Sequence, residues 1–306
     1  KEFVYYLFFI VLFTSFYNPV TTLLDSINLD MIEQNPEVSY GELRLWASIG
    51  WATGTVVTGQ FINSSNLHLI FAIAAVQLFL VACVTFFLYK PLRVTKNIAS
   101  LKLNTIKDLI FSDRRLTIFL GVLLAYGVFS APIQMFINIY YSEIGAGYNQ
   151  IGYAFAVQSL SELPFFFFGQ RIVNRYGAKN VLIFTMVVTA LRMVAYGFTA
   201  NPWVAIAIGS SHGIGLALFL VAVVNYLHAY VPAHLRATGQ SFVFAFYFGA
   251  GVSGGNMFTG WLKDLISIKT AMWLQGSLAL SLAVLAVFIL TNKHHKEEAE
   301  TTVEMA

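Results

Sequence analysis

Nine apolar stretches occupy most of this 306-residue chain, and each is long enough to cross a lipid bilayer. A helix rises about 1.5 Å per residue and the hydrocarbon core is about 30 Å thick, so one crossing needs roughly 20 apolar residues. The stretches run over residues 3–27, 43–64, 67–89, 116–141, 149–170, 180–198, 202–227, 239–262 and 268–291. The chain is therefore predicted to be a polytopic membrane protein.

The spanning elements are predicted to be helices. Strands of a membrane barrel are about ten residues long and alternate polar with apolar residues. The runs Leu216–Val224 and Leu278–Leu290 are instead apolar on almost every side. An all-α bundle with nine transmembrane helices follows from this pattern.

The lysines and arginines between the stretches predict the orientation. Thirteen of the eighteen lie in one set of alternate loops and in the tail after the last stretch: Lys90, Arg93, Lys96, Lys102, Lys107, Arg114, Arg115, Arg171, Arg175, Lys179, Arg236, Lys293 and Lys296. The opposite side holds Lys1, Lys263 and Lys269. Cytoplasmic loops carry the excess of cations, so the carboxyl terminus is expected in the cytoplasm and Lys1 outside. A multi-pass protein of the plasma or inner membrane is expected.

The basic segment 90–115 divides the chain unevenly, with three stretches before it and six after. Carriers built from two bundles of six helices are common. We therefore expect the second half of one bundle over residues 1–89, a cytoplasmic connector over 90–115, a complete bundle over 116–292 and a tail over 293–306. Because the chain begins with lysine, nine helices of an expected twelve are predicted, and the piece by itself is not expected to transport.

Composition excludes several functions. The lone Cys83 rules out an internal disulfide and a cysteine metal cluster, and no metal or cofactor is expected. The net charge of +3 comes from the cytoplasmic loops, so it does not indicate a nucleic-acid partner. The expected partners are a small solute, a proton and the lipid bilayer, and the protein is expected to be monomeric.

Three ionisable residues, Glu162, Arg192 and His212, lie deep within the apolar stretches, and Arg44 lies near the start of its stretch. Such residues are costly in hydrocarbon and usually mark a pathway or a site. Glu162 is the best candidate to bind and release a proton. The alternatives are that Arg44 extends to the headgroups, that Arg192 has a structural partner and that His212 is a packed histidine.

Residues 43–64 are predicted to place Arg44, Ser48, Trp51 and Thr55 on one helix face, because successive residues are about 100° apart. An arginine hydrogen-bonds hydroxyls and an indole stacks on a sugar ring or a base. This face is therefore a candidate site for a polar ring-bearing solute. The alternative is that Trp46 and Trp51 are packing or interface residues.

Pairs of glycines four residues apart indicate close helix crossings rather than chemistry. These pairs are Gly50 and Gly54, Gly209 and Gly213, and Gly251 and Gly255.

Three motifs resemble lactose permease and its relatives in the major facilitator superfamily. They are Gly41-x-x-Arg44-x-x-x-Ser48-x-Gly50-Trp51, the loop Asn174-Arg175-Tyr176-Gly177-Ala178-Lys179-Asn180, and Arg192 followed twenty residues later by His212. The resemblance covers nearly the whole chain and implies helices four to twelve of a proton symporter. It implies sugar binding by Arg44 and Trp51, a site-lining Ser48, a coupling and binding network of Tyr126, Arg192 and His212, and a sugar-binding position at Glu162.

The chain also differs from that pattern. Ser159, Gly215, Gly127 and Ser130 stand where the lactose permease has carboxylates, and Gly209 replaces a lysine. Lactose is therefore not the expected solute. The segment around Trp51 is closer to related nucleoside and phenylpropionate permeases, which keep a glutamate like Glu162.

The function predicted from these residues is proton-coupled symport of a sugar, oligosaccharide or nucleoside by alternating access. Arg44, Ser48, Trp51, Tyr126 and Glu162 are expected to bind the solute. Glu162, His212 and Arg192 are expected to couple the proton.

A facilitative uniporter of the same solutes, a non-transporting sensor and a membrane hydrolase using Ser210, Ser211 and His212 are the alternatives. Adjacent helical residues point about 100° apart and no carboxylate lies on that helix, which argues against the hydrolase. No catalytic residue is expected.

Overall fold

The computed structural model describes residues 4–16, 20, 24, 40–88, 113–232 and 235–291, with the side chains of α2 described from residue 46 onward. Its regular elements over these residues are helices. The chain forms two compact units, Lys1–Ala47 with Leu67–Ala99 and Ser48–Asn66 with Ser100–Ala306. The predicted connector and tail lie almost wholly outside the described residues, and the predicted domain boundaries stay a prediction.

The first unit contains a helix over Val4–Phe16, the beginning of α2 (Tyr40–Phe61) and α3 (Leu69–Leu88). α3 is apolar on all sides, and none of its apolar window is buried by protein. Such a helix suits hydrocarbon, because its backbone groups bond internally and its side chains need no polar partner.

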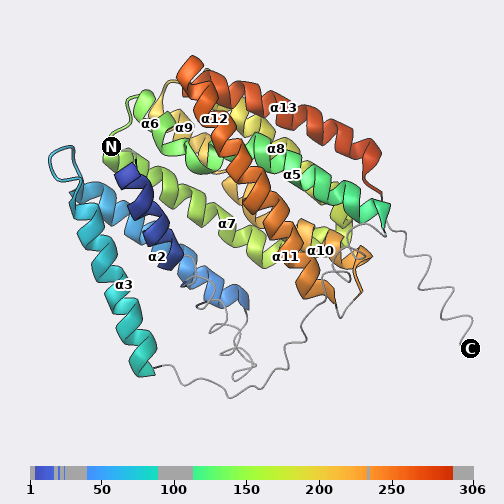
Figure 1. The fold of residues 1–306 in the computed structure, drawn as a ribbon, viewed down its shortest axis with the longest axis horizontal. Helices are drawn as coiled ribbons and strands as arrows, with labels where there is room; N and C mark the ends of the chain where they lie inside the picture. Colours follow the sequence, from blue (N-terminus) through green and yellow to red (C-terminus); the bar gives the residue numbers. More distant parts are fainter. Residues whose placement is uncertain are drawn as a thin grey trace, which may run out of the picture. The chain divides into compact units, whose positions relative to one another are not determined.

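The second unit contains the helices that follow residue 113 in addition to the later part of α2. Several of its membrane-length rods are built from shorter segments laid end to end (Figure 1). In chain order the segments are α5 (Arg114–Met135), α6 (Ile137–Glu143), α7 (Tyr148–Tyr176), α8 (Ala178–Phe198), α9 (Pro202–Gly209), η1 (Ile214–Leu218), α10 (Phe219–Tyr230), α11 (Arg236–Phe244), η3 (Ala245–Val252), α12 (Ser253–Leu265) and α13 (Ile268–Ile289).

Six helices of the described residues are long and apolar enough to span a membrane: Leu69–Phe87, Arg114–Met135, Tyr148–Tyr176, Ala178–Phe198, Pro202–Tyr230 and Ile268–Ile289. They confirm an all-helical protein with multiple candidate spans, but the predicted count of nine is not confirmed. Of the predicted span 3–27, the described part includes the apolar helix Val4–Phe16, and most of the remainder lies outside the described residues. The stretches 43–64 and 239–262 are helical, yet their glycines and hydroxyl residues lower their hydropathy.

Short polar caps begin the helices where apolar stretches were predicted to start. The carboxylate of Asp113 accepts the backbone N–H of Arg115 at 2.8 Å before α5. The side chain of Asn201 accepts the N–H of Trp203 at 2.9 Å before α9. These side chains satisfy backbone donors that the first turn of a helix leaves free.

The second unit has two apolar clusters. One joins α5, α8, α10, η3 and α13 around residues such as Phe119, Met186 and Phe219. The other lies around Ile137, Met193 and residues near them. α13 packs against α8 and α5, and α7 packs against α9, η1 and α10. These contacts keep the helices in register around a polar interior.

Of the predicted close crossings, the pair Gly251 and Gly255 is confirmed. A Cβ added at Gly255 would lie 2.6 Å from the Cβ of Ala131 on α5, and one added at Gly251 would lie 2.8 Å from the carbonyl oxygen of Leu124. Gly50, in contrast, has no neighbouring atom within 4 Å of such a Cβ. Close contact with α5 therefore requires small residues on α12 and η3.

Replacing Gly255 by alanine is expected to destabilise the protein by about 1–3 kcal/mol, because the added methyl group overlaps α5. The measurement is the thermal unfolding of purified protein in detergent. Gly121→Ala is the matched control, since Gly121 is exposed on α5 and its added Cβ meets nothing within 4 Å. Equal unfolding temperatures for the two variants would contradict the close crossing.

Candidate functional site

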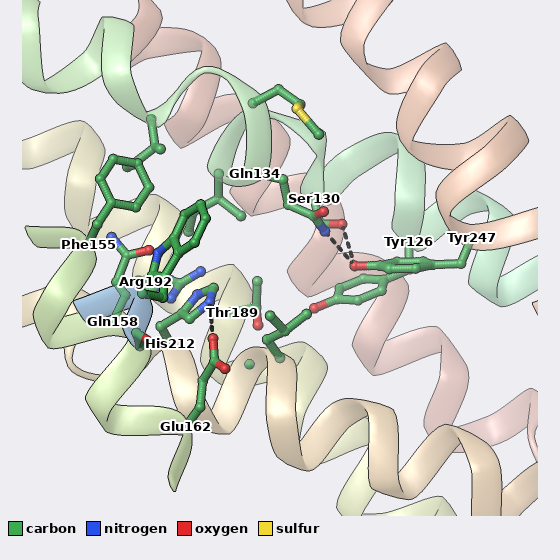
Figure 2. Close-up of a pocket in the computed structure, with 17 residues that line it drawn as sticks. Tyr126, Ser130, Gln134, Phe155, Gln158, Glu162, Thr189, Arg192, His212 and Tyr247 are labelled. Carbon is green, nitrogen blue, oxygen red and sulfur yellow. Dashed lines mark hydrogen bonds and ion pairs between the residues drawn. The ribbon is translucent and has the colours of Figure 1, made fainter. Parts of the chain in front are cut away.

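A cavity of about 270 Å³ lies inside the second unit. Residues of α2, α5, α6, α7, α8, the segment 212–216 and η3 line it (Figure 2). Its polar lining consists of Ser130, Gln134, Gln158, Ser159, Glu162, Thr189, Arg192 and His212, and its aromatic lining of Trp51, Tyr126, Phe155 and Tyr247. Polar side chains inside a transmembrane bundle thus gather around one space.

Glu162 and His212 form a close pair in this cavity. The Nε2 atom of His212 lies 3.1 Å from the Oε1 atom of Glu162, and their side chains are 18% and 14% exposed. Figure 2 shows the pair at the wall of the cavity, with the glutamate on α7 and the histidine on the neighbouring rod. Whether the proton sits on the carboxyl or on the imidazole, the two atoms remain within hydrogen-bond reach.

A backbone contact places His212 beside α7. The N–H of Gly213 donates to the hydroxyl oxygen of Ser161 at 2.9 Å. A Cβ added at Gly213 would overlap the carbonyl of Ser161, so only glycine lets the two rods meet this closely. Since His212 precedes Gly213 and Glu162 follows Ser161, this contact brings the ionisable pair together.

The rod that carries His212 is irregular at this point. α9 ends at Gly209, and the backbone N–H groups of Ser210 and Ser211 bond three residues back, to Ala207 and Ile208. The π-helical segment η1 begins at Ile214. Departures of this kind often occur at functional sites.

The serines next to His212 are occupied within their own helix. The hydroxyl of Ser210 donates to the carbonyl of Ala207 at 2.7 Å, and that of Ser211 to the carbonyl of Ile208 at 2.8 Å. The imidazole Nε2 of His212 instead lies 3.1 Å from the carboxyl Oε1 of Glu162. The arrangement of nucleophile, base and orienting group that a serine hydrolase needs is not formed here.

Arg192 lies on α8 and is only 5% exposed. Its Nε and Nη1 atoms have no hydrogen-bond partner. Around it lie the phenols of Tyr126, Tyr141, Tyr196 and Tyr247. Within the described part of the chain, no carboxylate is paired with this guanidinium.

Tyr247 organises the opposite wall of the cavity. Its hydroxyl accepts the amide Nε2–H of Gln134 at 2.8 Å and lies 3.3 Å from the hydroxyl of Ser130. Its ring stacks on Tyr126 with 5.8 Å between the centroids. Figure 2 shows these residues gathered on one side of the cavity, away from Glu162.

The residues predicted on α2 have different positions. Trp51 lines the cavity and is 58% exposed. Ser48 is 5% exposed and is not among the lining residues; its backbone carbonyl accepts the hydroxyl of Ser159 at 3.0 Å. The side chain of Arg44 lies outside the described residues, so its role stays a prediction.

The structure thus brings together five residues proposed from the sequence: Trp51, Tyr126, Glu162, Arg192 and His212. Helical spacing could have revealed further lining residues. Ser130 and Gln134 follow Tyr126 at intervals of four, Gln158 precedes Glu162 by four and Thr189 precedes Arg192 by three. Such intervals place residues on one helix face, whereas Phe155 and Tyr247 have no comparable signal among so many aromatic residues.

The helical bundle and its polar interior cavity are features of the class of membrane solute carriers. The MFS_1 like family model matches residues 1–274, and the chain belongs to this family. The resemblance to the major facilitator superfamily is thereby confirmed.

The relatives are carriers of the same superfamily. The chain is 25% identical to the uncharacterized transporter YwbF of Bacillus subtilis, over 95% of this chain and 72% of the relative. It is 25% identical to a sucrose permease of Escherichia coli, over 93% of this chain and 69% of the relative. A crystal structure of a mutant of the nucleoside transporter NupG matches with a TM-score of 0.75 at 18% identity, covering 89% of this chain and 74% of that one, and shows the fold.

The different contacts of Ser48 and Ser159 lead to a stability prediction. Ser159→Ala removes the hydroxyl that bonds α2 to α7 and is expected to cost about 1 kcal/mol, whereas Ser48→Ala keeps the carbonyl acceptor. Thermal unfolding of both variants in detergent makes the comparison. A larger loss for Ser48→Ala would show that its side chain, not its backbone, makes the important contact.

Proposed function

We propose that the chain forms the greater part of a proton-coupled symporter that takes up a small polar, ring-bearing solute, a sugar, oligosaccharide or nucleoside, by alternating access. The observation that carries this proposal is the pairing of Glu162 with His212 at 3.1 Å in a cavity lined by aromatic rings. A half-buried carboxyl–imidazole pair provides a place to load and release a proton where a solute binds. Arg192 completes this coupling network.

The aromatic lining supports a ring-bearing solute. Trp51, Tyr126 and Phe155 all border the cavity, and aromatic faces stack on the apolar faces of sugars and bases. A volume of about 270 Å³ is near the lower end of the range for small-molecule pockets, which begins at about 300 Å³. The sucrose permease and the nucleoside transporter among the similar proteins are named for ring-bearing solutes.

The geometry also supports proton-coupled symport over the uniporter and the hydrolase. A facilitative uniporter would use the same aromatic walls, but the half-buried Glu162–His212 pair would have no function in it. The serine hydroxyls beside His212 bond to their own helix, which argues against the hydrolase. A sensor built on the same fold predicts no solute uptake.

Replacing Glu162 by glutamine is expected to abolish proton-driven accumulation in vesicles that carry the full-length protein, while exchange of labelled for unlabelled solute continues. Glutamine keeps the size of the side chain but cannot carry the proton. Glu143→Gln is the control, because Glu143 is exposed at the end of α6 and does not line the cavity. Accumulation that survives in Glu162→Gln would remove Glu162 from the coupling mechanism.

We further propose that the carboxyl terminus is cytoplasmic and that the multi-pass protein lies in the cell membrane. The two ends of α8 test this orientation, with Tyr176 before it and Ala200 after it both exposed. In a Cys83→Ala background, a membrane-impermeant maleimide added to intact cells is expected to label Ala200→Cys and to leave Tyr176→Cys unlabelled until the cells are permeabilised. The reverse pattern would invert the topology.

A further inference from the structure

Arg192 presents unused hydrogen-bond donors at the wall of the cavity. Its side chain is 5% exposed, it lines the cavity, and its Nε and Nη1 atoms have no hydrogen-bond partner. Moving a guanidinium out of water is costly unless an anion compensates its charge. Without such an anion, the guanidinium is a buried cation with no partner. The guanidinium of Arg192 is therefore suited to bind an anion that does not belong to the described residues.

The carboxylate that lines the cavity does not fill this role. Glu162 pairs with His212, and the groups that interact with the charge of Arg192 are the phenols of Tyr126, Tyr141, Tyr196 and Tyr247 together with His212. A neutral phenol can accept a hydrogen bond, but it does not neutralise a cation. Among the described residues that line the cavity, no carboxylate forms an ion pair with Arg192.

A second donor without a partner belongs to a residue that lines the same cavity. The amide Nε2 of Gln158 is buried, has no hydrogen-bond partner and belongs to a lining residue. Figure 2 shows Gln158, Arg192 and His212 gathered on one side of the cavity. A guanidinium fork with a neighbouring amide matches the two oxygens of a carboxylate, each of which accepts more than one hydrogen bond.

We propose that the transported solute is a ring-bearing monocarboxylate, whose carboxylate binds Arg192 and Gln158 and whose ring packs against Trp51 and Phe155. The proposal rests on the transport function proposed above, and it replaces the neutral solutes named there with ring-bearing acids. Sugar acids and purely aromatic acids both belong to this class of solute.

The charge balance of the cavity explains how such a solute would be coupled to a proton. With Arg192 charged and Glu162 ionised, the pair of charges sums to zero. Binding of the solute anion adds one negative charge, and protonation of Glu162 removes one. The anion and the proton therefore favour each other's binding, and the loaded and empty carriers have the same net charge. Uptake moves one proton and one anion together and carries no net charge.

The binding test compares matched pairs on the purified full-length protein: glucuronate with glucose, and phenylacetate with phenylacetamide. Titration calorimetry is expected to show the carboxylate binding at least roughly tenfold more tightly than its neutral counterpart, as charge-assisted hydrogen bonds imply. Arg192→Gln is expected to remove this preference, whereas Arg171→Gln, at an exposed arginine that stacks over Phe168, is expected to keep it. Equal or tighter binding of the neutral member overturns the proposal.

A current measurement on the unmodified protein tests whether the transported solute is an anion or a neutral molecule. It needs no variant, so it remains valid if Arg192→Gln does not fold. On a solid-supported membrane, uptake of a carboxylate is expected to acidify the vesicle interior without a net current. A neutral solute taken up with a proton would give an inward current. Proton-driven accumulation that is accompanied by such a current would leave the proposed symport intact and overturn the acidic solute.

Discussion

The interior of a bilayer offers no water to polar groups, and this constraint shapes the whole molecule. Backbone groups are satisfied within helices, and hydroxyls bond to carbonyls of their own helix, as Thr259 does with Gly255 and Ser277 with Trp273. Several polar groups that are not satisfied in this way line the cavity. Glu162 and His212 pair there, while the guanidinium of Arg192 keeps free donors. The proposed functional residues are thus the ionisable ones, whose placement inside the membrane has the highest free-energy cost.

Close approach of backbones gives the cavity its shape. Glycine lets the rod containing Gly213 touch α7 at Ser161, and lets η3 and α12 touch α5. Both π-helical segments, η1 and η3, supply lining residues, among them Gly215 and Tyr247. Irregular backbone is tolerated in a membrane where neighbouring helices or a cavity satisfy it.

Hydropathy predicted most of the helices that the structure describes, because the length of an apolar run is a local property. It was weaker for residues 239–262, where small and hydroxyl residues serve packing and lower the apolar signal. The ionisable residues Glu162, Arg192 and His212 were singled out from the sequence by their cost in hydrocarbon, and the structure adds that they line one cavity. Helix-face spacing predicted that Ser48 would line the site together with Trp51, but only Trp51 lines the cavity. Two residues on one helix face need not both reach the same cavity.

The sequence by itself determined that the protein is a helical membrane protein, and its charge distribution led to a predicted orientation. Its motifs pointed to the major facilitator superfamily. These properties follow from composition and local order along the chain. Only the tertiary structure decided that Glu162 contacts His212, that Tyr247 holds Gln134 and that Arg192 has donors without partners. Those contacts join residues on different helices, and their geometry depends on how closely neighbouring helices pack, which no single stretch of sequence specifies.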